Sequence, residues 1–418
     1  MIVETDAGGD PDDEQSLVRF LMYANEWDIE GIIANRPVAR EGENTHVERT
    51  GIGIVRSLLR AYGECYPQLV QHDPRYPTME ALLERTVAGG VGTAAAELVL
   101  AALESEDPRP VWFLNWGTDY GSNPSALKLA LDQVHAQRGA AEYARLKSRL
   151  RLSSDDRFGE HTWEVPPAFP LWVDTFRPER DGGRWYHRFS ALTATAGGFD
   201  IERDVRTGHG PLGSMYPVNT DRPQKEGDSM TFLYLVPTGM NHPEHPEWGS
   251  WGGRYGLREE KGVGRPYYWA NVADAWHGTV KRDHVLARWA VALQNDFKAR
   301  LDWCVAPFEQ ANHPPLVTVA GEAIRHVKPG ERIGLDATAT TDPESDALSF
   351  EWYVYPEAGS YEGPPVELHS SEPARVVFTA PELDETRELH VVLAVTDAGE
   401  PALTRYARLI FRGPQADH

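Results

Sequence analysis

The first part of the chain alternates segments of two hydrophobic periods. Short apolar runs predict strands, and apolar residues spaced i, i+3, i+4, i+7 predict helices. The predicted elements are the strand Met1–Glu4, helix Glu14–Asn25, strand Ile29–Ala34, helices His46–Tyr62 and Thr93–Glu104, strand Val111–Trp116 and helix Ser125–Arg138. This order is typical of an α/β fold with a mostly parallel sheet and flanking helices. We expect ligands to bind beyond the carboxyl ends of its strands.

The pattern changes after Asp155, where Trp, Tyr, Gly and Pro become frequent and periodic segments become rare, until the predicted helix Asp283–Phe297. Long loops over an α/β core are usually functional segments. A second change falls at Asn312. Beyond it, short alternating runs predict the strands Leu316–Val319, Arg332–Ala337, Ser349–Tyr355, Ala374–Thr379, Leu389–Thr396 and Arg405–Arg412. Strands at this spacing predict an all-β, immunoglobulin-like sandwich, so we expect two domains, 1–311 and 312–418.

Composition narrows the function classes. Of 418 residues, 41% are hydrophobic and 25% charged, which indicates a folded protein. The net charge of −22 disfavours nucleic acid and anionic membranes as partners, and is compatible with a sugar-containing small molecule or a bound cation. No apolar run approaches the ~20 residues of a membrane span. The amino-terminal residues have no signal-peptide pattern, which predicts a cytoplasmic protein, or a periplasmic or secreted one if a leader precedes them.

The two cysteines, Cys65 and Cys304, are far apart in the sequence and cannot form a disulfide framework. We expect two reduced, buried thiols, with a single bridge between them as the alternative.

The densest chemistry lies between the first strand and its helix, where six carboxylates fall within eleven residues: Glu4, Asp6, Asp10, Asp12, Asp13 and Glu14. Such crowding is unfavourable unless water or a cation screens it. Helix capping is the alternative, because Asp complements the positive end of the helix dipole. Capping explains one or two of these acids, but not six beside two glycines. The pattern therefore favours a metal site.

Carboxylate oxygens are hard ligands, so the loop favours Ca²⁺, with Mg²⁺ as the second choice and Zn²⁺ disfavoured. Pro11 stands where an EF-hand loop needs its turn glycine, which excludes that motif. A phosphatase-type Asp-x-Asp nucleophile would need an aspartate at the position of Glu4. A metal-dependent phosphohydrolase is therefore only a third hypothesis.

Several other motifs accompany this loop: Asp28-Ile-Glu-Gly-Ile-Ile33, Glu226-Gly-Asp-Ser229, Phe232-Leu-Tyr-Leu235, Trp248-Gly-Ser-Trp-Gly-Gly-Arg254, Asn312-His-Pro-Pro315 and Asp342-Pro-Glu-Ser-Asp346. The strand, the sequence Asp-x-Gly-x-x-Pro-Asp-Asp and the following helix resemble the calcium-binding signature of the nucleoside hydrolase superfamily. All the motifs together resemble its nucleoside hydrolase-like branch, the DUF1593 or Sde182-like cellulose-binding proteins, over nearly the whole chain.

The resemblance implies roles for the acidic loop. Asp6 would bind the metal and act as general base, Asp12 would hold a ribose-like diol, and Asp13 would bind the metal through both oxygens. The loop has two more residues than that of the hydrolases, near Asp10 and Pro11, so the register of Asp10 stays open.

The resemblance also implies residues outside the loop. A main-chain carbonyl at Ser122 and the carboxylate of Asp228 would complete the metal ligands, with a helix N-cap as the alternative role for Asp228. Asn35 would line the substrate, with an ordinary turn residue as the alternative.

The function that the resemblance implies is Ca²⁺-dependent hydrolysis of an N-glycosidic or related glycosidic bond, by attack of metal-activated water on an anomeric carbon. His209, His242 and His245 are candidates to protonate the leaving group, and we assign this role to His242. The segment Ser153-Ser-Asp-Asp156 does not reproduce the superfamily's sugar-contacting loop. A non-catalytic saccharide-binding protein on a hydrolase-like fold is therefore the alternative.

Many aromatic residues crowd the region before the last predicted helix: Trp163, Trp172, Trp185, Tyr186, Trp248, Trp251, Tyr255, Tyr267, Tyr268, Trp269 and Trp276. They could form a saccharide platform, but packing of long loops against the sheet is favoured. For Trp251 and Arg254 we expect a place in the substrate pocket, because the neighbouring glycines allow close approach and Arg254 offers a planar fork of donors.

In the C-terminal domain, four acids surround one turn: Asp336, Asp342, Glu344 and Asp346. The pattern resembles PKD- and cadherin-like domains, some of which bind Ca²⁺, but we expect a solvated acidic turn. The domain is expected to pack against the first one or to mediate association into a homo-oligomer.

Overall fold

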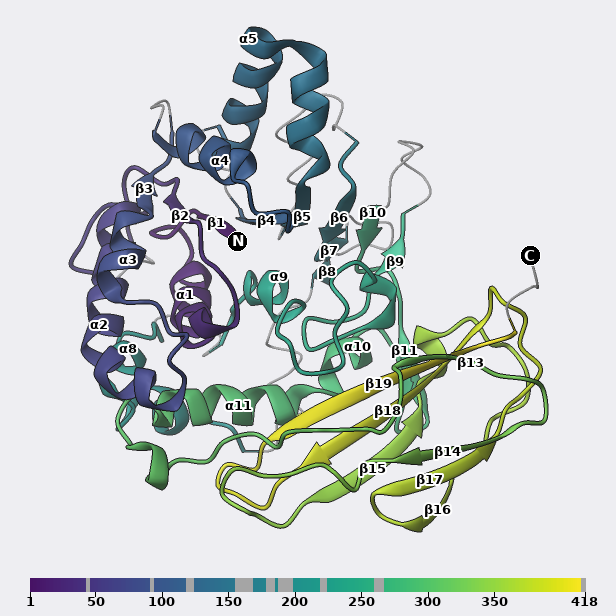
Figure 1. The fold of residues 1–418 in the computed structure, drawn as a ribbon. Helices are drawn as coiled ribbons and strands as arrows, with labels where there is room; N and C mark the ends of the chain where they lie inside the picture. Colours follow the sequence, from purple (N-terminus) through teal and green to yellow (C-terminus); the bar gives the residue numbers. More distant parts are fainter. Residues whose placement is uncertain are drawn as a thin grey trace.

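The computed structural model describes residues 1–42, 46–90, 94–117, 124–154, 168–177, 185–186, 198–218, 224–258 and 267–414. An eight-stranded sheet with the order β3-β2-β1-β4-β5-β6-β10-β9 organises the first domain (Figure 1). All neighbouring strands are parallel except β9 and β10. The strands are β1 (Ile2–Thr5), β2 (Gly31–Ala34), β3 (Thr86–Ala88), β4 (Val111–Trp116), β5 (Leu150–Ser154), β6 (Leu171–Asp174), β9 (Gly256–Leu257) and β10 (Tyr267–Trp269). The predicted mostly parallel α/β fold is confirmed.

Helices cover both faces of this sheet. Successive strand residues point to opposite sides, so the two faces belong to different core clusters. Val3 belongs to a core cluster with residues of α1, α2, α9 and α11, whereas Ile2 belongs to a second cluster with residues of α4 and α5. The helices are α1 (Asp12–Met22), α2 (Gly51–His72), α3 (Met79–Glu84), α4 (Ala94–Glu104), α5 (Ala126–Ser148), α8 (Gly210–Ser214), α9 (Ser229–Leu233), α10 (His284–Ala287) and α11 (Ala290–Asp302).

Shorter elements fill the connections. They are the 3-10 turns η1 (Ala24–Glu26), η4 (Pro246–Trp248) and η6 (Phe308–Gln310), the π-helical turn η3 (Glu202–Arg206), and the strand pairs β7 (Phe176–Arg177) with β8 (Trp185–Tyr186) and β11 (Asp274–Trp276) with β12 (Thr279–Lys281). None of the described helices is both long and apolar enough to cross a membrane. Cys65 and Cys304 are buried free thiols, as expected.

The ends of two predicted helices were wrong for identifiable reasons. Helix α2 begins at Gly51 rather than at His46, because the side chain of Thr50 caps it by accepting a hydrogen bond from the Gly53 amide, and it extends to His72. Helix α5 continues to Ser148 across a break at Gly139, whose φ of 82° is left-handed. The predicted end at Arg138 is the start of that break.

The C-terminal domain has two facing sheets, β13-β19-β18-β15 and β14-β17-β16, which confirms the predicted all-β sandwich (Figure 1). The strands are β13 (Ile324–His326), β14 (Arg332–Asp336), β15 (Ser349–Val354), β16 (His369–Glu372), β17 (Arg375–Thr379), β18 (Glu388–Thr396) and β19 (Thr404–Arg412), with the 3-10 turn η7 (Pro356–Ala358) after β15. The predicted strand Leu316–Val319 was wrong. Only Leu316 pairs there, in an isolated bridge with Thr341.

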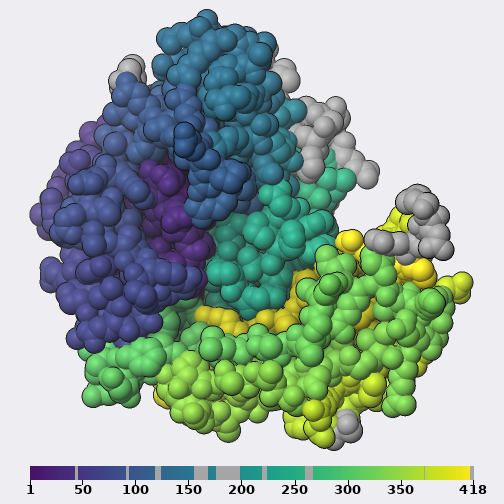
Figure 2. All heavy atoms as spheres, viewed as in Figure 1, coloured from purple at the N-terminus to yellow at the C-terminus, as the bar shows by residue number. Residues whose placement is uncertain are grey.

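The two domains share a core. Tyr355, Val392 and Tyr406 of the sandwich belong to the largest apolar cluster of the first domain. Arg408 of β19 donates hydrogen bonds to the carbonyls of Trp248 and Gly249 in the first domain, at 2.8 and 2.9 Å. In the space-filling view, the C-terminal residues lie along the lower side of the first domain (Figure 2). The sandwich is thus packed onto the α/β domain through both apolar and polar contacts.

Candidate functional site

The acidic loop follows β1, and its backbone turns sharply before α1. Gly8 has a φ of 95°, and the Gly9 amide donates to the Asp6 carbonyl at 3.0 Å. Glu14 accepts a hydrogen bond from the Gly8 amide at 2.9 Å, which holds the loop against the first turn of the helix. The loop therefore places its remaining acids at the carboxyl edge of the sheet.

Glu4, the first of the six acids, has a structural role. Its buried carboxylate accepts hydrogen bonds from the Ser125 hydroxyl at 2.7 Å and the Ala126 amide at 2.9 Å, at the start of α5. Asn35 Nδ2 donates to the same carboxylate at 2.8 Å. Burial raises the pKa of Glu4 against these hydrogen bonds. Asn35 thus binds the protein's own carboxylate, which supports the alternative of a structural residue over a substrate-lining one.

Two further acids form ion pairs with basic side chains. Asp6 Oδ2 lies 2.6 Å from Arg36 Nη2, and Asp10 Oδ1 lies 2.9 Å from Lys225 Nζ. Both pairs are partly exposed. The positive partners reduce the repulsion that the sequence alone predicts for this loop.

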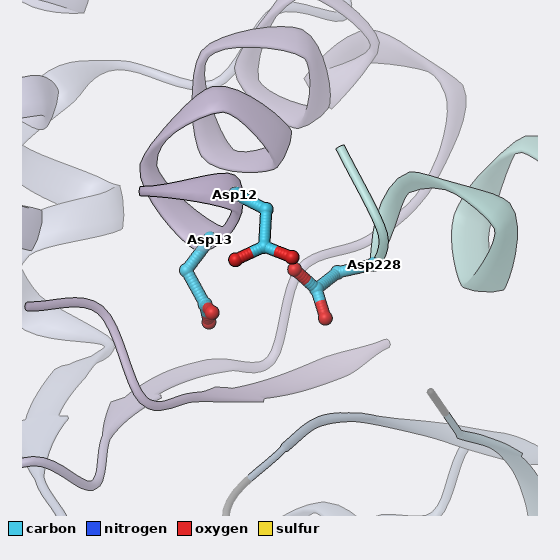
Figure 3. Close-up of side chains that lie close together, drawn as sticks. All are labelled: Asp12, Asp13 and Asp228. Atoms are coloured by element: carbon cyan, nitrogen blue, oxygen red, sulfur yellow. The ribbon is translucent and has the colours of Figure 1, made fainter. Parts of the chain in front are cut away.

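The last two acids meet a distant one. Asp12 and Asp13 come from the first turn of α1, and Asp228 precedes α9; Figure 3 shows their side chains converging. One carboxylate oxygen from each lies within 4.8 Å of the others, and each residue is at most 7% exposed. Among the described residues, this triad is the one group of three or more His, Cys, Asp or Glu side chains whose ligand atoms lie this close together.

The electrostatics of the triad favour a bound cation. Burial and the negative charges of Asp228, Asp6 and Asp12 raise the pKa of Asp13 well above its ordinary value. Asp13 Oδ1 accepts hydrogen bonds from the Thr5 hydroxyl and the Asp6 amide, which fix that oxygen. A divalent cation would remove the repulsion, and three carboxylates suit a hard ion such as Ca²⁺ or Mg²⁺. The residues present therefore fit the expected metal.

Asp228 lies beside Asp12 and Asp13 because hydrogen bonds attach the segment before it to α1. Gln15 Oε1 accepts from the amides of Lys225 and Glu226, at 2.8 and 3.2 Å. On the other side, Trp116 at the end of β4 donates from its indole to Thr231 Oγ1 at 2.8 Å. These bonds fix the start of α9 beside the carboxyl ends of β1 and β4.

The triad differs from the expected metal ligands in one carboxylate, because Asp12 takes the place expected for Asp6. Asp12, to which the resemblance gave a sugar diol, lies with Asp13 and Asp228, whereas Asp6 faces Arg36. Ser122, the expected carbonyl ligand, lies outside the described residues, as do Asp155 and Asp156. No sequence signal identified Arg36 as the partner of Asp6.

The candidate histidines have their contacts elsewhere. His242 stacks edge-on against His245 and Trp248. Its neighbour Pro243 lines a cavity of about 360 Å³ together with Val111, at the amino end of β4. Because the triad lies at the carboxyl edge, these contacts do not support the assignment of His242 as the catalytic acid.

The other two histidines bind neighbouring acids. His209 Nδ1 lies 3.0 Å from Asp302 Oδ1, and His245 Nδ1 lies 2.9 Å from Glu247 Oε1. Neither recorded pair involves the triad. The structure therefore gives these histidines structural partners rather than a position beside the metal site.

The expected pocket residues Trp251 and Arg254 are at the domain interface. Trp251 has no exposed surface, and the guanidinium of Arg405 lies 5.6 Å from its ring centre. Arg254 Nε donates to Asp274 Oδ1 at 2.8 Å. Trp251 thus has no exposed face for a sugar ring, and the Arg254 guanidinium is paired with the protein's own carboxylate.

Of the seven other aromatic residues whose burial is described, five are buried, as favoured, and Tyr268 and Trp276 are half-buried. Those that are buried are Trp172, Trp248, Tyr255, Tyr267 and Trp269. Trp163 lies outside the described residues.

Comparisons with known proteins agree with the fold. The chain matches the family model "Cellulose-binding Sde182, nucleoside hydrolase-like domain" over residues 1–255 and the model "Cellulose-binding protein Sde0182, C-terminal domain" over residues 332–413. No curated protein matches. A solved structure of a nucleoside hydrolase-related hypothetical protein from Saccharophagus degradans, described as associated with carbohydrate metabolism, is 29% identical, with a TM-score of 0.76 and 99% coverage of each chain.

Two protocadherin structures also match, the extracellular domain of protocadherin gamma B4 and cadherin domains 3–6 of gamma B2. Each is 18% identical over 24% of this chain, covering 16% and 24% of those chains, with TM-scores of 0.17 and 0.16. The α/β fold, the sandwich and the two family matches together show that the chain belongs to the family of Sde182-like proteins with a nucleoside hydrolase-like domain.

Proposed function

We propose that the protein is a Ca²⁺-dependent hydrolase of an N-glycosidic, nucleoside-like bond or a related glycosidic bond. The observation that carries the proposal is the convergence of Asp12, Asp13 and Asp228, all buried, at the carboxyl edge of the parallel sheet. This edge is where α/β folds bind their ligands. The family match supports the same conclusion.

In this proposal the triad holds the cation, which supplies a Lewis acid that orients water and sugar hydroxyls when it is bound. Asp6 takes a proton as general base. Its Oδ2 is engaged with Arg36, so the accepting atom is Oδ1, which lies on the side of Gly117. Burial raises the pKa of Asp6 while Arg36 opposes the rise, so the carboxylate is a stronger base than an exposed one.

A second candidate function is non-catalytic saccharide binding at the same edge of the sheet. Two observations favour it: the family descriptions name cellulose binding, and the candidate histidines have their contacts away from the triad. In that case the triad would hold a cation that orders a binding surface, without turnover.

Calorimetry with Ca²⁺ on chelator-stripped protein, followed by assays on nucleosides and other glycosides, tests the proposal. Asp13→Asn should abolish both Ca²⁺ binding at the triad and turnover while the chain stays folded. Asp10→Asn is the matched control, because Asp10 lies in the same loop but pairs with Lys225. Release of free sugar by the wild type supports the hydrolase. Binding of cellulose or other saccharides without any release supports the second candidate.

A further inference from the structure

A second cluster of oxygen atoms lies at the junction of the two domains, far from the acidic loop in sequence. It contains Asn312, at the predicted domain boundary, Asp342, in the turn before β15, and Asp397, in the turn after β18. Asn312 and Asp397 are 7% and 4% exposed. Asn312 and Asp397 are thus buried, whereas Asp342 is half-buried in an acidic turn whose Glu344 is exposed, in keeping with the expected solvated turn.

In each of the two aspartates, one carboxylate oxygen accepts hydrogen bonds, and the other has no hydrogen-bond donor among the described residues. Asp397 Oδ1 accepts from Asn312 Nδ2 at 3.0 Å, the Gly399 amide at 3.0 Å and the Leu403 amide at 2.9 Å. Asp342 Oδ1 accepts from the amides of residues 344 and 346, at 3.0 and 2.9 Å. Within the part of the chain that the structure describes, no donor reaches Oδ2 of either residue, although both atoms are buried.

Asn312 has the same arrangement. Its Nδ2 donates to Asp397 Oδ1 and to the Pro401 carbonyl at 2.8 Å, which fixes the amide with Oδ1 as the remaining atom. That Oδ1 is also buried, and no described donor reaches it. Buried polar atoms normally have a partner, so three such oxygens in one place require an explanation.

The three residues are held together by further contacts. The His313 amide donates to Glu344 Oε2 at 3.2 Å, two residues beyond Asp342, and Leu316 pairs with Thr341 through the backbone. Asp342 is close enough to Asp397 for its charge, together with burial, to raise the pKa of Asp397. No described Lys or Arg forms an ion pair with either aspartate. A small cation would satisfy all three oxygens at once.

We propose that Asn312, Asp342 and Asp397 form a second Ca²⁺ site, which ties the segment between the domains to two turns of the sandwich. Carboxylate and amide oxygens are the ligands that Ca²⁺ prefers, and water can complete its shell. Because only two of the ligands are charged, we expect a dissociation constant on the order of 0.1–1 mM. The site is independent of the triad and of the proposed hydrolase activity.

The test uses the full chain carrying Asp13→Asn, which removes the triad as a binding site. Calorimetry should still detect one Ca²⁺, and Ca²⁺ should raise the melting temperature. Adding Asp397→Asn should abolish both effects, because asparagine keeps the accepting Oδ1 but puts an amide nitrogen in place of Oδ2. Asp342→Asn is the second variant, for the case that Asp397→Asn does not fold.

Asp384→Asn is the matched control, because Asp384 Oδ1 accepts from the amides of residues 386 and 387 in a similar turn, at 2.9 Å each, but its side chain is exposed. This control should keep the second Ca²⁺. The proposal is overturned if the folded Asp13→Asn protein binds no Ca²⁺ at concentrations roughly tenfold above the expected range. It is also overturned if both site variants bind Ca²⁺ as well as the control does.

Discussion

Arg19 and Glu226 form an ion pair with no exposed surface, and this pair places the third acid of the triad. Arg19 Nε lies 2.5 Å from Glu226 Oε2, and Arg19 Nη2 lies 3.2 Å from Oε1. Glu226 also accepts from the Tyr216 hydroxyl at 2.6 Å and the Ser229 hydroxyl at 2.8 Å. Because Asp228 follows two residues later, helix α1 determines the position of the acid that faces its own first turn.

The first prediction is that Glu226→Gln weakens both the fold and Ca²⁺ binding at the triad. Removing one partner of a buried pair leaves an uncompensated charge, which costs about 3–5 kcal/mol. Urea unfolding should show this loss, and calorimetry should show reduced Ca²⁺ affinity. The control is Asp132→Asn, which breaks the surface pair of Asp132 with Lys128 and should cost less than about 1 kcal/mol.

If Glu226→Gln does not fold, the double variant Arg19→Met with Glu226→Gln removes both charges and should recover part of the stability. Unchanged Ca²⁺ affinity in a folded Glu226→Gln protein would show that the pair does not position Asp228.

The second prediction is that Asp13→Asn stabilises the metal-free protein while it removes Ca²⁺ binding. Burial and three neighbouring carboxylates raise the pKa of Asp13, so its negative charge is unfavourable without a cation. Asparagine keeps an accepting Oδ1 for Thr5 and removes the charge. Urea unfolding with a chelator present should show a gain on the order of 1–3 kcal/mol. A lower metal-free stability than wild type would mean that the triad is balanced without a cation.

The sequence predicted which residues belong to the site better than it predicted the role of each residue. Six acids in one loop predicted a metal site at the first strand, and Asp228, predicted as a ligand together with Asp13, does lie beside Asp12 and Asp13. The loop alone could not show that Glu4 binds the start of α5, or that Asp6 binds Arg36, because these partners are distant in sequence. Contacts of this kind depend on the tertiary structure.

The predictions of the strands and of the catalytic histidine were limited in a similar way. The strand β4 was predicted with its observed ends because it is a continuous apolar run, whereas β3, β9 and β10 are too short to give a periodic signal. His242 was chosen for its chemistry and its place near other motifs in the sequence. Its contacts with His245 and Trp248 follow from the path of the chain, which the spacing of residues does not specify.

The third prediction concerns Asn35, which the resemblance assigned to the substrate. Because Asn35 donates to buried Glu4, Asn35→Ala should lower the free energy of unfolding by about 1–3 kcal/mol and leave Ca²⁺ affinity unchanged. Asn35→Asp should be worse than Asn35→Ala, because it puts a second carboxylate beside Glu4. Urea unfolding and calorimetry give both numbers. A weaker substrate or saccharide affinity in Asn35→Ala at unchanged stability would restore the substrate role.

The last prediction is a pH dependence set by His390 at the domain interface. Arg408 Nη1 lies 3.0 Å from His390 Nδ1, and His390 Nε2 lies 3.2 Å from Glu388 Oε2. Since arginine only donates, Nδ1 must accept, so the buried imidazole is neutral, with its proton on Nε2. Burial lowers the pKa of His390, and Arg408 lowers it further against the opposing effect of Glu388.

Because the folded pKa lies below the unfolded value of about 6.5, His390 contributes stability above that pH, and this contribution is lost as the pH falls toward the folded pKa. Urea unfolding of the wild type should therefore show stability falling below about pH 6.5, by up to about 1.4 kcal/mol per pH unit from this group. His390→Gln, which can still accept from Arg408 and donate to Glu388, should remove that slope. His369→Gln is the control, because His369 is 72% exposed, and it should keep the slope. Equal slopes in both variants would mean that His390 titrates alike in the folded and unfolded chains.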